Sequence, residues 1–298
     1  MAVSPFSDVT LEKLFPPSRA VLASEAPARP LVAEKRLFVA DEDGGLLPQP
    51  LAQGPFDSLH GGAIGGLLAN RAEALAAEQG LGTPIAAHIQ FLRPIKAEHR
   101  LTVVAEVAVP GRRLNLVDAF IEAGDGLRAE GRFTFARDLP TAVPVELDGG
   151  PRLTHPDHLP EIMPPLMPTA PWFKDALEWR SDGATVWMRP KIELGPDHHI
   201  LPRVIATADW AAGISRPDGW SRPQVAGFPN PALTVNLWRR PIGAWIGLTP
   251  SSRWNQGGFG LAQGVLSDEA GDLGHALLPI VLIPHPERHA GQKSAPTA

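Results

Sequence analysis

The feature that most constrains this chain is an internal repeat, because one order of elements occurs twice. Each copy has a short strand, then a helix, then four strand-like segments. The first of these four strands ends at Arg93-Pro94 in one copy and at Arg240-Pro241, 147 residues later, in the other. Two copies at a nearly constant offset indicate a duplicated domain fused into a pseudo-dimer.

The first copy is predicted from a short strand at Lys35–Ala40 and a helix over His60–Glu78, which is rich in Ala, Leu and Glu and stops at Gly80. Asp125-Gly126 marks a tight hairpin between the last two strands. The four predicted strands are Ile85–Arg93, Leu101–Val109, Leu114–Ala123 and Leu127–Phe135.

The second copy repeats this order, with a strand at Ala184–Arg189 and a helix over Leu201–Ser215 that carries Pro202 in its first turn. Its four predicted strands are Ala232–Arg240, Ala244–Thr249, Gly260–Ser267 and Leu273–Ile283.

Proline marks the boundary between the copies. Nine of the 33 prolines lie between Pro140 and Pro171, a density that no long helix or central strand tolerates. The sequence therefore predicts an N-terminal domain over 1–138, a Pro-rich linker over 139–174 and a C-terminal domain over 175–285. Residues 286–298 are small and polar, and we expect a disordered tail there.

Composition excludes several classes of function. The formal charge of −5 argues against a nucleic-acid-binding protein, and the absence of cysteine excludes disulfides, thiolate nucleophiles and Cys-ligated metals. No apolar run is long enough to cross a membrane, and the first residues do not resemble a signal peptide, so we expect a cytoplasmic protein.

Three segments carry a family resemblance: HGGAIGGLLA (60–69), AHIQFLRPI (87–95) and NPALTVNLWRRPIGAWIGL (230–248). In this order and duplicated, they resemble the double-hotdog acyl-CoA thioesterases of the acyl-CoA thioesterase II type. The resemblance implies an α+β tandem (double) hotdog, with two antiparallel sheets each wrapped around a central helix. It also implies hydrolysis of acyl-CoA by water that an Asp on the second helix activates, without a metal or redox cofactor.

The first helix begins with His60, Gly61 and Gly62, whose backbone N–H groups no side chain shields. Such a helix start can bind an anion or a developing oxyanion, although the two glycines can also serve only to let the helix lie close to the sheet. The resemblance favours the first interpretation, because in those enzymes the equivalent N–H polarises the thioester carbonyl. His60 is then a substrate-binding residue.

The second helix shows the complementary pattern. Its start, Ile200-Leu201-Pro202, is a poor anion site, but Asp209 is the one charged residue between Arg203 and Arg216. A lone carboxylate in an apolar run is costly unless it is paired, which favours a functional role. At the equivalent position of the first helix stands Ala69, so each helix retains half of one composite site.

The other candidates are weaker. The family adds a hydroxyl and a Gln near the Asp; Thr234 is the nearest hydroxyl, and the possible stand-ins for the amide are Asn230, Asn236 and Gln263. Trp210 is predicted to line an acyl channel. The arginines predicted to bind coenzyme A phosphates, with ordinary surface charge as the alternative, are Arg112, Arg113 and Arg240, the last as part of Arg239-Arg240.

The sequence therefore predicts a thioester hydrolase with Asp209 as general base and Gly61 and Gly62 as oxyanion donors. The alternative is a non-catalytic acyl-CoA-binding or sensor protein, favoured by the missing Gln. The expected partner is an acyl-CoA substrate, with no nucleic acid and no membrane. A homo-oligomer is expected because the strands over 232–249 carry few charges.

Overall fold

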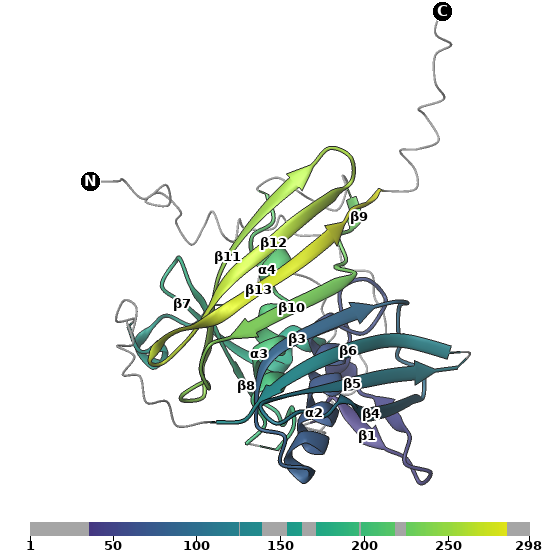
Figure 1. Ribbon diagram of the computed structural model, residues 1–298. Coiled ribbons are helices and arrows are strands. Elements are labelled where there is room, and N and C mark those ends of the chain that lie inside the picture. Colours follow the sequence, from purple (N-terminus) through teal and green to yellow (C-terminus); the bar gives the residue numbers. More distant parts are fainter. Residues whose placement is uncertain are drawn as a thin grey trace, which may run out of the picture.

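The computed structural model describes residues 36–124, 126–138, 154–162, 171–196, 198–217 and 225–284. Its main feature is one antiparallel sheet of twelve strands in the order β1-β2-β4-β5-β6-β3-β10-β13-β12-β11-β8-β7, with the helices packed on its inner face (Figure 1). A second, two-stranded sheet pairs β9 (Val225–Gly227) with β14 (Ile283–Pro284).

The N-terminal half follows the predicted order of elements. Its helix α2 (Gly61–Glu78) packs on β3 to β6, whose inward side chains alternate with outward ones. Residue Ala63 of α2 and Val117 of β5 are both almost completely buried. The strands of this half are β1 (Phe38–Ala40), β2 (Leu46–Pro48), β3 (Thr83–Phe91), β4 (Leu101–Val109), β5 (Leu114–Ala123) and β6 (Gly126–Ala136).

The C-terminal half differs from the prediction in its helix. The expected single helix over Leu201–Ser215 is two pieces, α3 (Leu201–Ala208) and α4 (Ala211–Ile214), separated by Asp209 and Trp210. Asp209 therefore stands at a helix end, where its poor helix propensity costs little. The strands of this half are β7 (Leu177–Ser181), β8 (Val186–Pro190), β10 (Ala232–Leu237), β11 (Ile246–Asn255), β12 (Phe259–Asp268) and β13 (Gly271–Val281).

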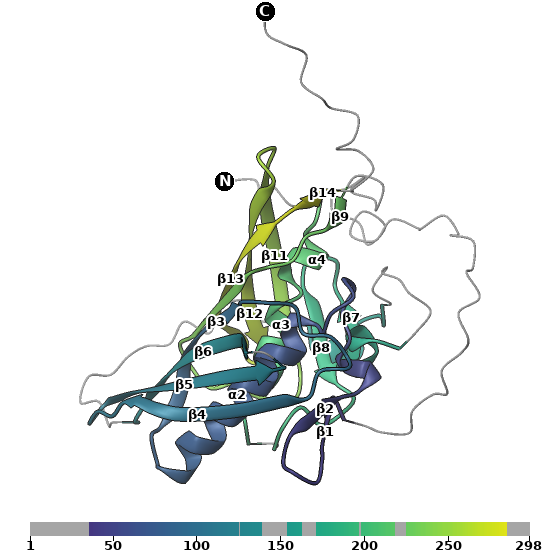
Figure 2. The same ribbon diagram turned by 90° about the vertical axis from the view of Figure 1, so that its right-hand side faces the viewer.

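The two sheets expected from the sequence are one. Strand β3 of the first half pairs antiparallel with β10 of the second, so that Ala87 lies opposite Val235 and the ladder continues across the boundary. Figure 2 shows the sheet curving round the helices, with β3 and β13 on one side of α3 and β8 on the other. The α+β hotdog character holds, but the halves share one continuous sheet.

Glycines bring α2 and α3 together as an antiparallel pair. A Cβ on Gly62 would lie 3.2 Å from the carbonyl oxygen of Ala206, and one on Gly65 would lie 2.8 Å from Cγ2 of Ile205. On Gly66 it would lie 3.5 Å from the carbonyl oxygen of Pro202. The backbone of α3 thus rests almost directly on α2, in the middle of the molecule.

Part of the predicted linker is packed structure. Leu159 joins Trp187 and Trp245 in a small buried cluster, and Trp172 and Phe173 are buried in the main core. Short 3₁₀ turns cover Pro50–Ala52, Pro156–His158 and Phe173–Ala176. Residues 139–153 and 163–170 of the predicted linker, and the predicted tail over 286–298, lie outside the described residues.

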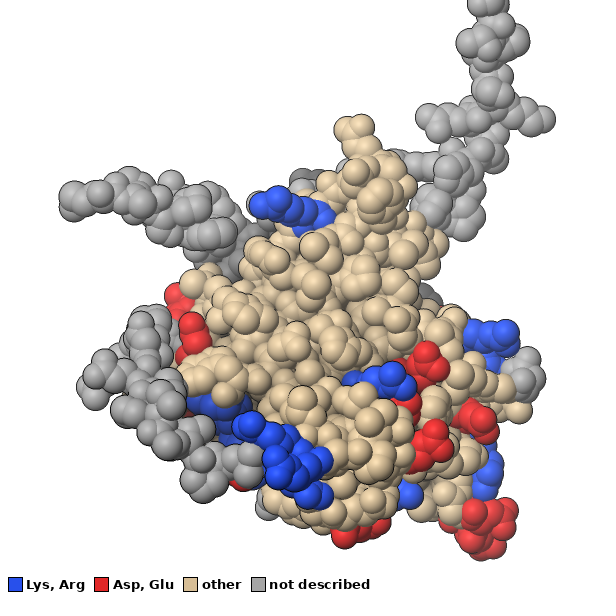
Figure 3. All heavy atoms as spheres, in the orientation of Figure 1, with Lys and Arg blue, Asp and Glu red and all other residues tan. Residues whose placement is uncertain are grey.

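The outer face of β10 to β13 carries few charges, whereas charges gather over the N-terminal half (Figure 3). Its outward side chains include four exposed apolar groups, Trp238, Phe259, Leu261 and Leu277. Among the described helices, none combines the length and the apolarity that crossing a membrane requires.

Candidate active site

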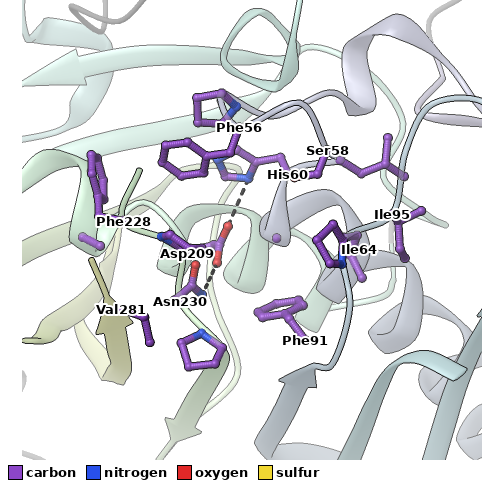
Figure 4. Close-up of a pocket in the computed structure, with 18 of the residues that line it drawn as sticks. Phe56, Ser58, His60, Ile64, Phe91, Ile95, Asp209, Phe228, Asn230 and Val281 are labelled. Atoms are coloured by element: carbon purple, nitrogen blue, oxygen red, sulfur yellow. Dashed lines mark hydrogen bonds and ion pairs between the residues drawn. The ribbon is translucent and has the colours of Figure 1, made fainter. Parts of the chain in front are cut away.

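A cavity of about 270 Å³ lies where the start of α2 meets the end of α3 (Figure 4). Its wall is mostly apolar, and its charged groups are Asp209 and Arg93, with His60 as a further titratable group. The side chains that line it include Phe56, Ile64, Phe91, Ile95, Trp172, Trp210, Phe228 and Val281. Such a chamber with a few polar groups at one place is typical of a small-molecule site.

The start of α2 is held by its own loop. The N–H of His60 donates to the carbonyl of Ala52 at 2.9 Å, and His60 is the N-cap of the helix. Its Nδ1 accepts the N–H of Gly62 at 3.0 Å. The N–H of Gly61 has no hydrogen-bond partner among the described residues, and Gly61 lines the cavity. One free donor at the positive end of the helix therefore faces the chamber.

The carboxylate of Asp209 lies next to this donor. One of its oxygens, Oδ2, is 3.0 Å from Nδ1 of His60, and the other, Oδ1, accepts from Nδ2 of Asn230 at 2.9 Å (Figure 4). Asp209 is only 7% exposed. A Cβ on Gly61 would come within 2.7 Å of Oδ2, so only glycine admits the carboxylate here. The structure thus brings Asp209 and the start of α2 together, as expected from the two helices.

Aromatic rings surround His60 on several sides. Its ring centroid lies 4.6 Å from that of Phe173, in a stacked arrangement, and 4.6 Å from that of Trp210. Trp210 in turn meets Trp179 edge-on at 4.7 Å. Contacts of this kind fix the orientation of the imidazole and exclude water from it.

The start of α3 was predicted to be a poor anion site, and the structure corrects this. The carboxylate of Glu73, from α2, accepts the N–H groups of Ile200 at 2.9 Å and Leu201 at 2.8 Å. Pro202 removes a donor only one residue later, so two N–H groups remain free to bind an anion. Burial raises the pKa of Glu73 to about 7, although these two hydrogen bonds and the charges of Arg203 and Arg240 favour its ionised form.

Four predicted site residues line the cavity together: His60, Gly61, Asp209 and Trp210. Gly62 does not, because His60 occupies its N–H and because Phe173 and the backbone of α3 crowd its Cα. Its glycine serves close packing, the alternative considered from the sequence.

Thr234 also lies elsewhere. Its neighbours Leu233 and Val235 are buried against the helices, so Thr234 is on the outer face of β10, where its Oγ1 is 3.3 Å from Nδ1 of His88. Asn236 shares that outer face and is exposed. Of the polar residues considered, Asn230 is the one that contacts Asp209.

The arginines predicted to bind phosphates are distant from the cavity. Arg112 and Arg113 are in the β4–β5 turn. The side chain of Asn115 donates to the carbonyl of Leu81, so this turn lies beside the segment that follows α2. The length of α2, about 27 Å, separates that segment from Gly61. Arg240 contacts Thr83, at the same end of the molecule. Among the described residues, Arg93 is the arginine that lines the cavity.

Sequence reasoning missed the aromatic wall, because Phe56, Phe91, Trp172 and Phe228 come from four separate segments. Asn230 was named from the sequence as a possible stand-in for the family's Gln, and it lies between Pro229 and Pro231 just before a strand. Arg93 lies two residues after the end of β3, whose last residue, Phe91, also lines the cavity.

An antiparallel sheet curved around buried helices, with a helix start and a carboxylate facing one apolar chamber, is the arrangement that the double-hotdog resemblance implies. Residues 48–136 match the family model of the acyl-CoA thioesterase N-terminal domain, and residues 142–273 match that of the C-terminal domain. The chain belongs to the acyl-CoA thioesterase family.

Solved structures share the fold at low identity. The tesB protein of Mycobacterium avium subspecies paratuberculosis is 18% identical, with 83% of this chain and 96% of that one covered and a TM-score of 0.57. The acyl-CoA thioesterase II TesB2 of Mycobacterium marinum is 16% identical, with 76% and 91% covered and a TM-score of 0.56. A hotdog-fold protein of unknown function from Alicyclobacillus acidocaldarius is 16% identical, with 83% and 96% covered and a TM-score of 0.60. No curated protein matches the chain in sequence.

Proposed function

We propose that the chain hydrolyses acyl-CoA thioesters in this chamber, with Asp209 as general base and the Gly61 N–H as oxyanion donor. The observation that carries the proposal is the contact of the two halves: Oδ2 of Asp209 lies where a Cβ on Gly61 would be 2.7 Å away. A thioester carbonyl at the Gly61 N–H therefore has a carboxylate beside it, close enough to share one water molecule.

The reaction divides into two steps. In the first, the water oxygen bonds to the carbonyl carbon, Asp209 takes the water proton, and the negative charge moves to the carbonyl oxygen at the Gly61 N–H. In the second, the tetrahedral intermediate collapses, the C–S bond breaks, and the proton passes to the departing thiolate. The products are a free acid and coenzyme A, with Asp209 ionised again.

Asn230 and His60 position the base. The Nδ2 of Asn230 donates to Oδ1 of Asp209, which directs the carboxylate and leaves further lone pairs for water. The Nδ1 of His60 is 3.0 Å from both Gly62 N and Asp209 Oδ2, and one nitrogen cannot accept from the first while donating to the second. His60 thus holds the carboxylate of Asp209 against the start of α2.

The apolar wall accommodates the acyl group, and Arg93 is the cation available at this cavity for the phosphates of coenzyme A. Trp210 contributes to the wall and also holds His60. Glycine at position 61 is required because any side chain there would displace the carboxylate.

The test is thiol release from a series of short, medium, long and aromatic acyl-CoAs. Hydrolysis of at least one of them, abolished by Asp209→Asn, supports the proposal. A protein that binds acyl-CoA without releasing thiol would instead be the binding or sensor protein considered as the alternative.

A further inference from the structure

The start of α3 is closed by a residue from the other half of the molecule. Its N-cap, Ile200, has no capping side chain, and the carboxylate of Glu73 supplies two hydrogen bonds in its place. Glu73 is 6% exposed, and Ile200 and Leu201 are buried as well. This carboxylate is thus an internal part of the α2–α3 interface, remote from solvent.

The arrangement mirrors the active site. At one end of the antiparallel helix pair, Asp209, which directly follows α3, approaches the first residue of α2; at the other end, Glu73 of α2 binds the N–H groups at the start of α3. At the first end, Asp209 and Gly61 line the cavity and the Gly61 N–H is free, whereas at the second end the N–H groups of Ile200 and Leu201 both donate to Glu73. Each half therefore supplies a carboxylate to the helix start of the other, and one of the two ends has become structural.

The packing between the helices brings the backbone of α3 close to α2. Gly62 and Gly66 face the backbone of α3, and the side chain of Ile205 packs over Gly65. The two hydrogen bonds to the carboxylate of Glu73 add to this packing at the start of α3 and resist an axial shift of the helix, because such a shift lengthens them.

We propose that Glu73 is a positioning residue that fixes the axial register of α3 and thereby sets Asp209 against His60 and the Gly61 N–H. Asp209 directly follows α3, only eight residues of rigid helix from this anchor. A displacement at the start of α3 is therefore transmitted to the carboxylate. A misplacement of about 1 Å in a catalytic group can cost on the order of 10²-fold in rate.

The charges around Glu73 make this anchor sensitive to pH. Arg203 of α3 and Arg240, which follows β10, favour its ionised form, and His199, bonded to Asn70 of α2 at 2.5 Å, is a neighbour whose pKa is lowered by burial. Burial raises the pKa of Glu73 to about 7. The ionised form accepts both N–H groups, so the anchor strengthens as the pH rises through neutrality.

The kinetic test of this proposal rests on the proposed function, because it compares kcat and KM for acyl-CoA hydrolysis between Glu73→Gln and the wild type. We expect kcat to fall by about 10- to 100-fold with KM within about twofold, and the inflection of kcat near pH 7 to disappear. Glu78→Gln, at the exposed end of the same helix, is the matched control and is expected to leave kcat and its pH dependence unchanged. If Glu73→Gln does not fold, Glu73→Asp, which keeps the charge but shortens the reach by one methylene, is measured in its place.

Two readouts do not depend on activity. Amide hydrogen exchange at Ile200 and Leu201 is expected to accelerate in Glu73→Gln, and its crystal structure is expected to show Asp209 moved by about 1 Å from His60. A folded variant with an unmoved Asp209, or with wild-type kcat and pH profile, would overturn the positioning role. A wild type inactive on every acyl-CoA, with Asp209 displaced in the variant as expected, would instead contradict the proposed function alone.

Discussion

Replacing Asp209 by Asn tests the chemistry without removing the contacts around it. The amide oxygen can still accept from Nδ2 of Asn230, and the amide group has nearly the size and shape of the carboxylate. What disappears is the ability to take a proton from water, and general base catalysis is typically worth ~10²–10⁴-fold. We therefore expect kcat for thiol release to fall by that factor, which corresponds to about 3–5 kcal/mol in activation free energy.

The same substitution should leave the fold intact. Asp209 is 7% exposed, so removing its charge removes a desolvation cost, and the free energy of unfolding should hold or rise. Asp118→Asn, on the outer face of β5 where Asp118 pairs with Arg132, is the control and should retain activity. The reasoning is refuted if folded Asp209→Asn, with unaltered affinity for coenzyme A, hydrolyses acyl-CoA at the wild-type rate.

Three further predictions use other features of the structure. Gly61→Ala should lose at least about 10²-fold in activity, because the added Cβ would meet the carboxylate of Asp209. In Gly66→Ala the added Cβ would be 3.5 Å from its nearest neighbour, so this variant should stay active and its free energy of unfolding should rise by up to about 1 kcal/mol. Equal activities of the two variants would contradict the steric argument. The pKa of Glu73 rises from 4.5 in the unfolded chain to about 7 in the folded protein, so the folded state holds a proton that the unfolded state has lost. The free energy of unfolding should therefore fall by up to about 3 kcal/mol as the pH rises from 5 to 8. In denaturant titrations Glu73→Gln should lack this pH-dependent fall, and the same dependence of unfolding free energy on pH in both proteins would contradict the prediction. Light scattering should report a dimer or larger assembly through the weakly charged face of β10 to β13, and a particle of 31.9 kDa would show that the face is free.

The local patterns in the sequence predicted most of the elements. The helix over His60–Glu78 and the strands Leu101–Val109 and Leu114–Ala123 match the structure closely, because periodicity and turn residues act over short distances. The predicted meeting of Gly61 and Asp209 also holds, since it followed from comparing two copies of one element rather than from either copy alone.

Long-range packing accounts for what the sequence did not predict. The break of the second helix at Asp209-Trp210 and the joining of β3 to β10 depend on neighbours far away in the chain. The position of Arg112 and Arg113 away from the cavity has a similar cause: their charge suits phosphate, but only the fold determines at which end of α2 they lie. Glu73 was not recognised because its partners are backbone groups more than 120 residues away.

The central claim is that one thioester carbonyl meets the Gly61 N–H and Asp209 at the same time. The most direct test is a crystal structure of Asp209→Asn with an intact acyl-CoA bound. The account predicts the carbonyl oxygen at hydrogen-bond distance, about 2.9 Å, from Gly61 N, the acyl group against Phe91 and Trp210, and a water between residue 209 and the carbonyl carbon. A carbonyl turned away from Gly61, or an acyl-CoA bound at the far end of α2 near Arg112, would contradict it.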